Sequence, residues 1–205
     1  MVNQRRHFLK SVSMLAASTA FPINAFSFGK NKKLRVTLVG TGIRGSSFWG
    51  KRLVDQYSDI IEFVGLCDIN PGRLEYAKNY IGTNCKTYID FDLMLNQQNP
   101  DLIIVCTVDS THHQFIIKGL ESGCDVLTEK PLTTDETKGQ AILNAERKSD
   151  KKLIVGFNYR WNPYATKVKE LLINNTIGKI TSVDFNWYLN TYHGASYFRR
   201  WHGYK

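Results

Sequence analysis

The chain has 205 residues, of which 42% are hydrophobic, 12% aromatic and 22% charged. This composition is typical of a globular protein and excludes a disordered, collagen-like or disulfide-rich chain. The net charge of +9 does not indicate nucleic-acid binding, because residues 1–30 carry basic residues and no acid, and the later basic residues are interspersed with acidic ones.

The N-terminal residues 1–30 are predicted to be a twin-arginine export signal. Arg5-Arg6 precedes Lys10 and a modestly apolar run at 11–21, which is the layout of a charged region followed by a short hydrophobic one. That run is shorter than the roughly 20 residues of a membrane span, so no stable membrane anchor is expected. Because this route carries folded proteins, we expect a periplasmic protein that binds its cofactor before export. An ordinary basic tail is the alternative.

From residue 33 onward, short apolar runs alternate with helical patterns. Strands are predicted at 34–39, 61–67, 86–88, 102–107, 125–128 and 153–157, and helices at 43–57, 71–81, 90–96, 111–122 and 134–149. Strands separated by helices of this length indicate βαβ units and a parallel sheet. The predicted fold class is therefore α/β, with a doubly wound Rossmann domain over residues 31–158.

Residues 159–205 are predicted to begin a second domain. A helix is expected at 163–174, and residues 180–189 alternate between polar and apolar side chains, as one strand of an antiparallel sheet does. A lone strand is not stable, because its ladder groups and its apolar face stay exposed. We therefore expect 159–205 to be the incomplete start of an α+β substrate and oligomerisation domain.

A glycine-rich loop joins the first predicted strand to the first predicted helix, with the sequence Gly40-Thr41-Gly42-Ile43-Arg44-Gly45. In this G-x-G-x-x-G pattern the first glycine permits a tight turn, the second lets the backbone approach a diphosphate, and the third allows close helix–strand packing. The helix N-terminus offers free N–H groups and partial positive charge to the anion. The expected cofactor contacts are Gly40, Gly42, Ile43, Arg44 and Gly45.

An acidic residue, Asp68, ends the second predicted strand. A carboxylate at that place accepts hydrogen bonds from ribose hydroxyls and repels a 2′-phosphate, which favours NAD over NADP. Arg73 offers the alternative, since its side chain could reach a 2′-phosphate. A simple turn aspartate before Pro71 is the other interpretation of Asp68.

The four cysteines, Cys67, Cys85, Cys106 and Cys124, show no C-x-x-C spacing and no accompanying histidine cluster. No metal site is therefore predicted. Most of them lie in or beside apolar strand-like runs, so buried free thiols are expected, although a disulfide formed after export stays open.

Two further segments complete a family resemblance. Thr128-Glu129-Lys130-Pro131 ends one strand and the segment 107–112 ends another, both at the edge where such sheets bind ligands. With the glycine loop and Asp68, they resemble the Gfo/Idh/MocA family of sugar and inositol oxidoreductases over about residues 34–190.

The resemblance implies roles for individual residues. Lys130 matches the family's lysine beside the nicotinamide and the substrate hydroxyl, and it is expected to be catalytic; Glu129 is expected beside it at the cofactor. Thr107 and His112 match a segment lining the nicotinamide side, although Val108 replaces the family's proline. Asn158 and Arg160, which follow the last predicted strand, are expected to face the substrate cleft, with interdomain packing as the alternative.

The expected function is NAD-dependent oxidation of a sugar or polyol CH–OH group. Family members are roughly twice as long as this chain, so the catalytic half is expected to be incomplete and the full-length parent to be a homo-oligomer. Two alternatives stay open: an exported glycoside hydrolase that retains NAD, and a non-catalytic, truncated cofactor-binding fragment. No nucleic-acid partner is expected.

Overall fold

The computed structural model describes residues 32–188, 190, 191 and 195. The chain divides into two compact units, Met1–Phe157 and Asn158–Lys205. The predicted export signal at 1–30 lies outside the described residues, so it stays a prediction. In the part of the chain that is described, no helix is both long and apolar enough to cross a membrane.

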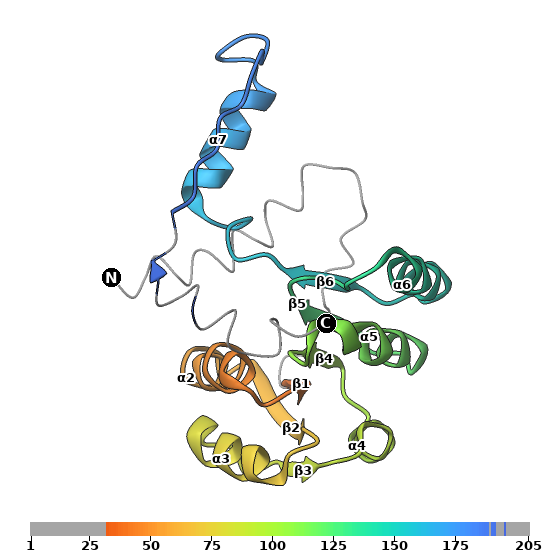
Figure 1. The fold of residues 1–205 in the computed structure, drawn as a ribbon. Helices are drawn as coiled ribbons and strands as arrows, with labels where there is room; N and C mark the ends of the chain where they lie inside the picture. Colours follow the sequence, from red (N-terminus) through yellow and green to blue (C-terminus); the bar gives the residue numbers. More distant parts are fainter. Residues whose placement is uncertain (1–31, 189, 192–194, 196–205) are drawn as a thin grey trace. The chain divides into compact units, whose positions relative to one another are not determined.

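Six parallel strands form one sheet in the first unit (Figure 1). The strands are β1 (Leu34–Val39), β2 (Ile61–Cys67), β3 (Lys86–Tyr88), β4 (Leu102–Val105), β5 (Asp125–Glu129) and β6 (Leu153–Gly156). Their spatial order is β3-β2-β1-β4-β5-β6, which is the strand order of the Rossmann fold. The predicted doubly wound α/β fold is therefore confirmed.

Helices cover both faces of this sheet (Figure 1). They are the π-helical η2 (Arg44–Lys51), α2 (Arg52–Tyr57), α3 (Pro71–Ile81), α4 (Phe91–Gln98), the short 3-10 helix η3 (Asp109–Thr111), α5 (His112–Glu121) and α6 (Glu136–Lys148). The bounds follow the sequence signals closely at α3, where the Asn70 side chain accepts the Arg73 N–H at 3.2 Å and Gly82 ends the helix in the left-handed region. The helix predicted at 134–149 is α6, and it begins two residues later, at Glu136, because the Asp135 carboxylate caps it by accepting the Lys138 N–H.

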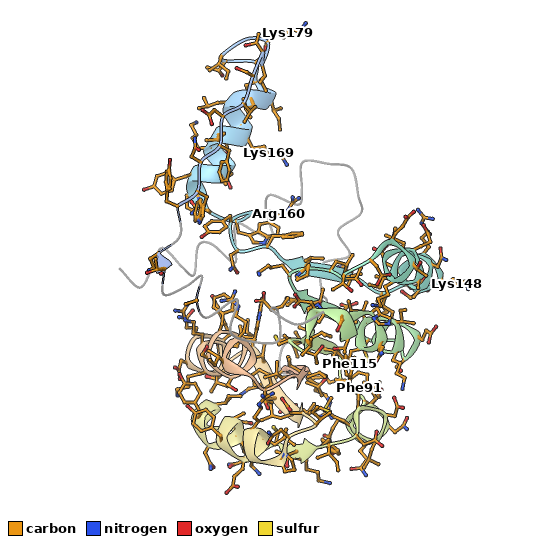
Figure 2. The ribbon with its side chains drawn as sticks, in the orientation of Figure 1. Phe91, Phe115, Lys148, Arg160, Lys169 and Lys179 are labelled. Atoms are coloured by element: carbon orange, nitrogen blue, oxygen red, sulfur yellow. The ribbon has the colours of Figure 1, made fainter. Side chains whose placement is uncertain are left out.

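A separate apolar core lies on each face of the sheet. One core joins the strands to η2, α2 and α3, and it contains Leu38, Leu66 and Ile81. The other joins the strands to α4, α5 and α6; there the rings of Phe91 and Phe115 meet edge to face at 5.0 Å (Figure 2). Because both faces are covered, the central strands are apolar at nearly every position, which is why the sequence shows continuous apolar runs.

The carboxyl ends of β1, β2 and β4 are tied together beyond the strands themselves. The Gly40 N–H donates to the Cys67 carbonyl at 2.8 Å, and the Cys106 N–H donates to the Val39 carbonyl at 2.7 Å. Beyond β2, the Asp68 N–H donates to the carbonyl of Tyr88, the last residue of β3. These bonds bring the glycine loop, Asp68 and the segment after β4 to one edge of the sheet.

The second unit contains α7 (Pro163–Ile173), which begins where the Asn162 side chain accepts the Tyr164 N–H. The strand predicted at 180–189 is not found: residues 180–188 have no regular secondary structure and are exposed. No described segment pairs with them, and an unpaired strand leaves its backbone groups without partners. The domain boundaries, and the assignment of this unit to a substrate domain, stay predictions.

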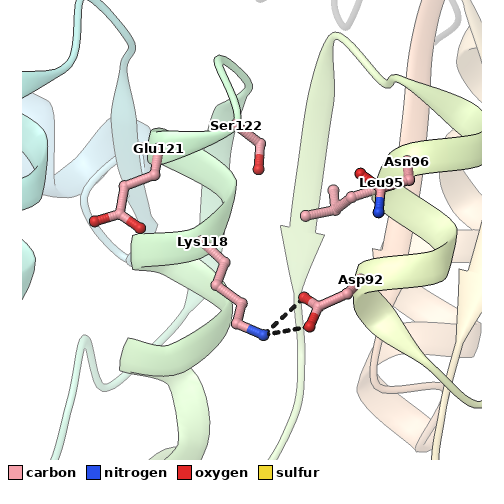
Figure 3. Close-up of a pocket in the computed structure, with 6 residues that line it drawn as sticks. All are labelled: Asp92, Leu95, Asn96, Lys118, Glu121 and Ser122. Carbon is pink, nitrogen blue, oxygen red and sulfur yellow. Dashed lines mark hydrogen bonds and ion pairs between the residues drawn. The ribbon is translucent and has the colours of Figure 1, made fainter.

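A pocket of about 270 Å³ lies between α4 and the end of α5 (Figure 3). The Lys118 ammonium bonds both carboxylate oxygens of Asp92 across it. The residues that line this pocket come from α4 and from the C-terminal part of α5 with its cap. None of them is one of the predicted site residues, so the pocket is not part of the predicted site.

Candidate functional site

The glycine loop makes the sharp turn from β1 into η2. Gly40 has φ +88°, and a Cβ on it would lie 2.5 Å from the main-chain carbonyl of Cys106. At Gly45 a Cβ would collide with the Gly40 carbonyl oxygen. Only glycine satisfies both demands, so these two residues shape the loop itself.

Gly42 differs from its neighbours, because no contact among the described residues requires a glycine there. A Cβ on Gly42 meets no atom of those residues within 4 Å, and its φ is not in the left-handed region. The space in front of this glycine is open at a helix start, where the N–H groups of the first turn are exposed to a ligand. A dinucleotide diphosphate fits this cradle, since a side chain at 42 would fill it.

The helix that follows the loop starts with a wider turn than expected. Residues 44–51 are π-helical before α2 continues as an ordinary α-helix. π-Helical turns occur mostly as short insertions at functional sites. Here the turn sets which side chains of the helix face the strand ends, as described below for Arg44 and Trp49.

Asp68 is buried at the end of β2, where it is held by the loop. Its Oδ2 atom accepts the Thr41 N–H at 2.8 Å and the Thr41 hydroxyl at 3.1 Å, while Oδ1 accepts the Asn70 N–H at 3.0 Å. These donors fix the carboxylate beside the open cradle and satisfy its buried charge. The arrangement suits a carboxylate that accepts ribose hydroxyls.

Glu129, at the end of β5, is also buried and receives three donors. Its Oε1 atom accepts Arg44 Nε at 2.6 Å and Trp49 Nε1 at 2.7 Å, and Oε2 accepts the Lys130 N–H at 3.2 Å. The Arg44 guanidinium also lies 3.9 Å from the centre of the Phe48 ring. Glu129 therefore joins the loop helix to the lysine segment.

Lys130 is exposed, whereas the residues around its main chain are not. His112 is 1% exposed; its Nδ1 lies 2.8 Å from the Pro131 carbonyl oxygen and its Nε2 lies 3.1 Å from the Thr107 carbonyl oxygen. The imidazole thus connects the segments after β4 and β5. Both ring nitrogens face main-chain carbonyls, so direct contact of His112 with a cofactor stays a prediction.

The structure brings most of the predicted residues of the first unit to one edge. It does not test Asn158 and Arg160, which belong to the second unit. There the guanidinium of Arg160, which is labelled in Figure 2, lies 5.5 Å from the centre of the Trp161 ring. Sequence reasoning missed Thr41 and Trp49. Thr41 could have been found as a hydroxyl-bearing residue inside the loop, whereas no sequence signal marks Trp49.

All four cysteines are free thiols, as predicted, but only Cys67 and Cys124 are buried, whereas Cys85 and Cys106 are partly exposed. Burial, and then the nearby Asp68 and Asp90 carboxylates, raise the pKa of Cys67 to about 12. Burial also raises the pKa of Cys85, Cys106 and Cys124 above the usual 9.0. Because the thiolate is the reactive form of cysteine, these four thiols react slowly in the folded protein.

This burial predicts a loss of stability in alkali. The unfolded Cys67 thiol ionises near its ordinary value of 9.0 and the folded one near 12, so the unfolded state loses its proton first as the pH rises. The stabilising contribution is present below about pH 9 and is lost as the pH rises toward 12. Urea unfolding across this range should show a shallower decline for Cys67→Ala than for the unchanged chain; identical slopes would contradict the assignment.

The comparisons with known proteins agree with this geometry. Residues 34–157 match the family model GFO_IDH_MocA, described as an oxidoreductase family with an NAD-binding Rossmann fold. The YteT protein of Bacillus subtilis is 39% identical over 170 residues, which cover 81% of this chain and 40% of YteT.

Two solved structures are similar to the chain in fold and sequence. The WlbA dehydrogenase of Bordetella pertussis, in complex with NADH and UDP-GlcNAcA, has a TM-score of 0.67 and 28% identity over 73% of this chain and 42% of its own. The myo-inositol dehydrogenase of Lactobacillus casei, in complex with NAD(H) and myo-inositol, has a TM-score of 0.67 and 28% identity over 72% and 43%. The chain therefore spans less than half the length of these relatives. Its glycine loop, strand order and matched residues place it in the Gfo/Idh/MocA oxidoreductase family, which has an NAD-binding Rossmann fold.

Proposed function

We propose that this chain supplies the NAD-binding and lysine-bearing part of an oxidoreductase that acts on a sugar or polyol CH–OH group. The observation that carries the proposal is the open cradle at Gly42, beside the fixed carboxylate of Asp68. The substrate class is supported by relatives whose structures hold myo-inositol or UDP-GlcNAcA with the cofactor.

The residues of the first unit divide the work between binding and chemistry. The loop amides, with the helix start behind them, bind the diphosphate, and Asp68 accepts the ribose hydroxyls. A bound nicotinamide would supply the acceptor for the hydride of the alcohol carbon. In the direction of oxidation the Lys130 amine would accept the hydroxyl proton as the hydride leaves the alcohol carbon, and in the direction of reduction the resulting ammonium would return that proton to the oxygen.

Calorimetric titration of the 205-residue chain with NADH tests the cofactor half of the proposal. The expected result is stoichiometric binding by the folded protein. The reaction half is tested by adding NAD+ and a panel of inositols, sugars and sugar nucleotides, and by following the reduced nicotinamide. Absence of NADH binding would refute the cofactor site, whereas sugar release without net reduced nicotinamide would point to a glycosidase.

Asp68 should determine the choice between NAD and NADP. We expect the unchanged chain to bind NADH at least about tenfold more tightly than NADPH, and Asp68→Ser to narrow that difference. The same variant should weaken NADH binding by about ten- to a hundredfold, the worth of a hydrogen bond to a charged group. Titration of both nucleotides measures this.

The matched control for this variant is Asp92→Ser. Its carboxylate pairs with Lys118 of α5 and not with the glycine loop, so the ratio of the two affinities should stay unchanged. Equal binding of NADH and NADPH by the unchanged chain would show that Asp68 does not exclude the 2′-phosphate. It would favour the alternative in which the Arg73 side chain contacts that phosphate.

We further propose that residues 1–30 direct twin-arginine export to the periplasm. The support is the Arg5-Arg6 pair before a short apolar run. Changing both residues, Arg5→Lys and Arg6→Lys, should retain the protein in the cytoplasm with its charge unchanged. Equal periplasmic amounts of the two forms, measured by fractionation, would refute export by this route.

A homo-oligomer of the whole protein is proposed as well. Its support is the set of apolar side chains that the second unit leaves exposed, among them Val183 at 81% and Phe185 at 76%. Surfaces of this kind mark association sites. Light scattering that finds only the monomer mass for the whole protein would refute this.

A further inference from the structure

Glu129 carries a buried carboxylate whose charge is balanced by donors from neighbouring residues. It is 6% exposed and accepts hydrogen bonds from Arg44, Trp49 and the Lys130 main chain. A buried carboxylate is stable only when it is paired and hydrogen-bonded. Removal of Arg44 therefore leaves an uncompensated charge beside Lys130.

The partners of Glu129 come from distant parts of the chain. Arg44 lies inside the G-x-G-x-x-G motif, Trp49 follows five residues later, and both lie on η2. Glu129 is the last residue of β5 and directly precedes Lys130. One carboxylate thus links the phosphate-loop helix to the main chain that carries the lysine.

Because Arg44 lies in the glycine loop, the simplest expectation is that its side chain binds a phosphate of the cofactor. In this structure its Nε bonds Glu129 at 2.6 Å, and its guanidinium stacks on the Phe48 ring at 3.9 Å. To reach a phosphate through Nε, Arg44 would have to leave Glu129 with a buried charge and fewer donors, which is costly. The contacts favour a role toward Glu129.

We propose that Arg44, Trp49 and Glu129 form a positioning cluster that fixes the main chain of Lys130, with Arg44 acting on Glu129 and not on the cofactor phosphates. The proposal deepens the proposed function and rests on it for the catalytic role of Lys130. The cluster itself does not depend on bound cofactor, so it can be tested separately.

The test uses the 205-residue chain and two measurements on each variant. Hydrogen exchange by NMR reports the Lys130 amide, with the buried Ile142 amide as an internal reference, and fluorescence titration reports NADH affinity. Arg44→Gln should speed exchange at Lys130 relative to Ile142 by at least about tenfold, the loss expected for one charge-assisted bond. NADH affinity should change by less than about threefold, a smaller change than that expected for a lost phosphate contact.

Three variants distinguish positioning from general loss of structure. Arg44→Lys keeps a cation near Glu129 and should restore slow exchange. The double variant Arg44→Gln with Glu129→Gln should exchange no faster than the faster single variant, because both remove the same interaction. Arg52→Gln is the matched control: its guanidinium lies 5.3 Å from the same Phe48 ring, and it should alter neither measurement.

The outcomes separate the two proposals. If Arg44→Gln weakens NADH binding at least tenfold and leaves Lys130 exchange unchanged, Arg44 is a phosphate ligand and the positioning cluster is wrong. If exchange rises equally at Lys130 and Ile142, the variant has lost global stability; failure of Arg44→Lys to restore slow exchange then also rejects the cluster. If the unchanged chain binds no NADH, the proposed function fails. The exchange rates of the Lys130 amide still test the positioning cluster in that case.

Discussion

Gly42→Leu is expected to abolish detectable NADH binding without unfolding the protein. A side chain at this position enters open space, since no atom of the part of the chain that the structure describes lies within 4 Å of the added Cβ. The melting temperature should therefore move by only about 1 to 2 °C, because a substitution without a clash changes stability by about 0.5 kcal/mol. The same side chain keeps the diphosphate away from the loop amides. Losing two such charge-assisted bonds weakens binding by more than about a hundredfold.

The matched control for this change is Gly139→Leu. Gly139 lies in α6, and its added Cβ would make only an ordinary contact at 3.7 Å with Thr133. This variant should bind NADH as the unchanged chain does. Gly45→Leu offers the opposite contrast, because its Cβ collides with the Gly40 carbonyl and should destabilise the fold itself. Normal NADH affinity in a folded Gly42→Leu protein would refute the cradle.

Lys130→Met is expected to slow hydride transfer by about a hundred- to ten-thousandfold, the usual contribution of a positioned proton-transfer group. The methionine keeps an unbranched side chain, one atom shorter than that of lysine, and removes the amine with its charge and its protons. The Lys130 main chain, held through Glu129 and Pro131, should stay in place. Affinity for NADH should therefore change little, and the loss should appear in the rate of the chemical step, measured by stopped-flow with saturating substrate.

Lys148→Met is the control for this prediction. Lys148 lies in the last turn of α6 and is exposed (Figure 2), so its replacement should leave both the rate and the affinity unchanged. A hydride-transfer rate in Lys130→Met within about threefold of the unchanged protein would show that another group moves the proton.

The first unit of the chain could be predicted from the sequence in some detail. Apolar runs marked each strand except β3, and Gly40 and Asp68 marked the strand ends, because these signals are local. Parallel strands that follow one another through helices share the edge where their carboxyl ends meet. The order of the motifs along the chain therefore already placed the glycine loop, Asp68 and Lys130 together.

The second unit could not be predicted equally well. The alternation at 180–189 is a good strand pattern, yet residues 180–188 form no strand. A strand depends on a partner that supplies its hydrogen bonds, and the pattern reports only which side chains share a face. The alternation of polar and apolar residues therefore predicted a strand for which the described residues supply no partner strand.

The sequence by itself determined the fold class, the loop and the lysine segment, since each depends on residues that are neighbours along the chain. Only the tertiary structure decided that Arg44 and Trp49 meet on one carboxylate, 85 and 80 residues away. In an α-helix, residues five apart point about 140° away from each other, so the expected geometry separates them. The π-helical turn closes its hydrogen bonds between residues five apart and brings both side chains toward Glu129.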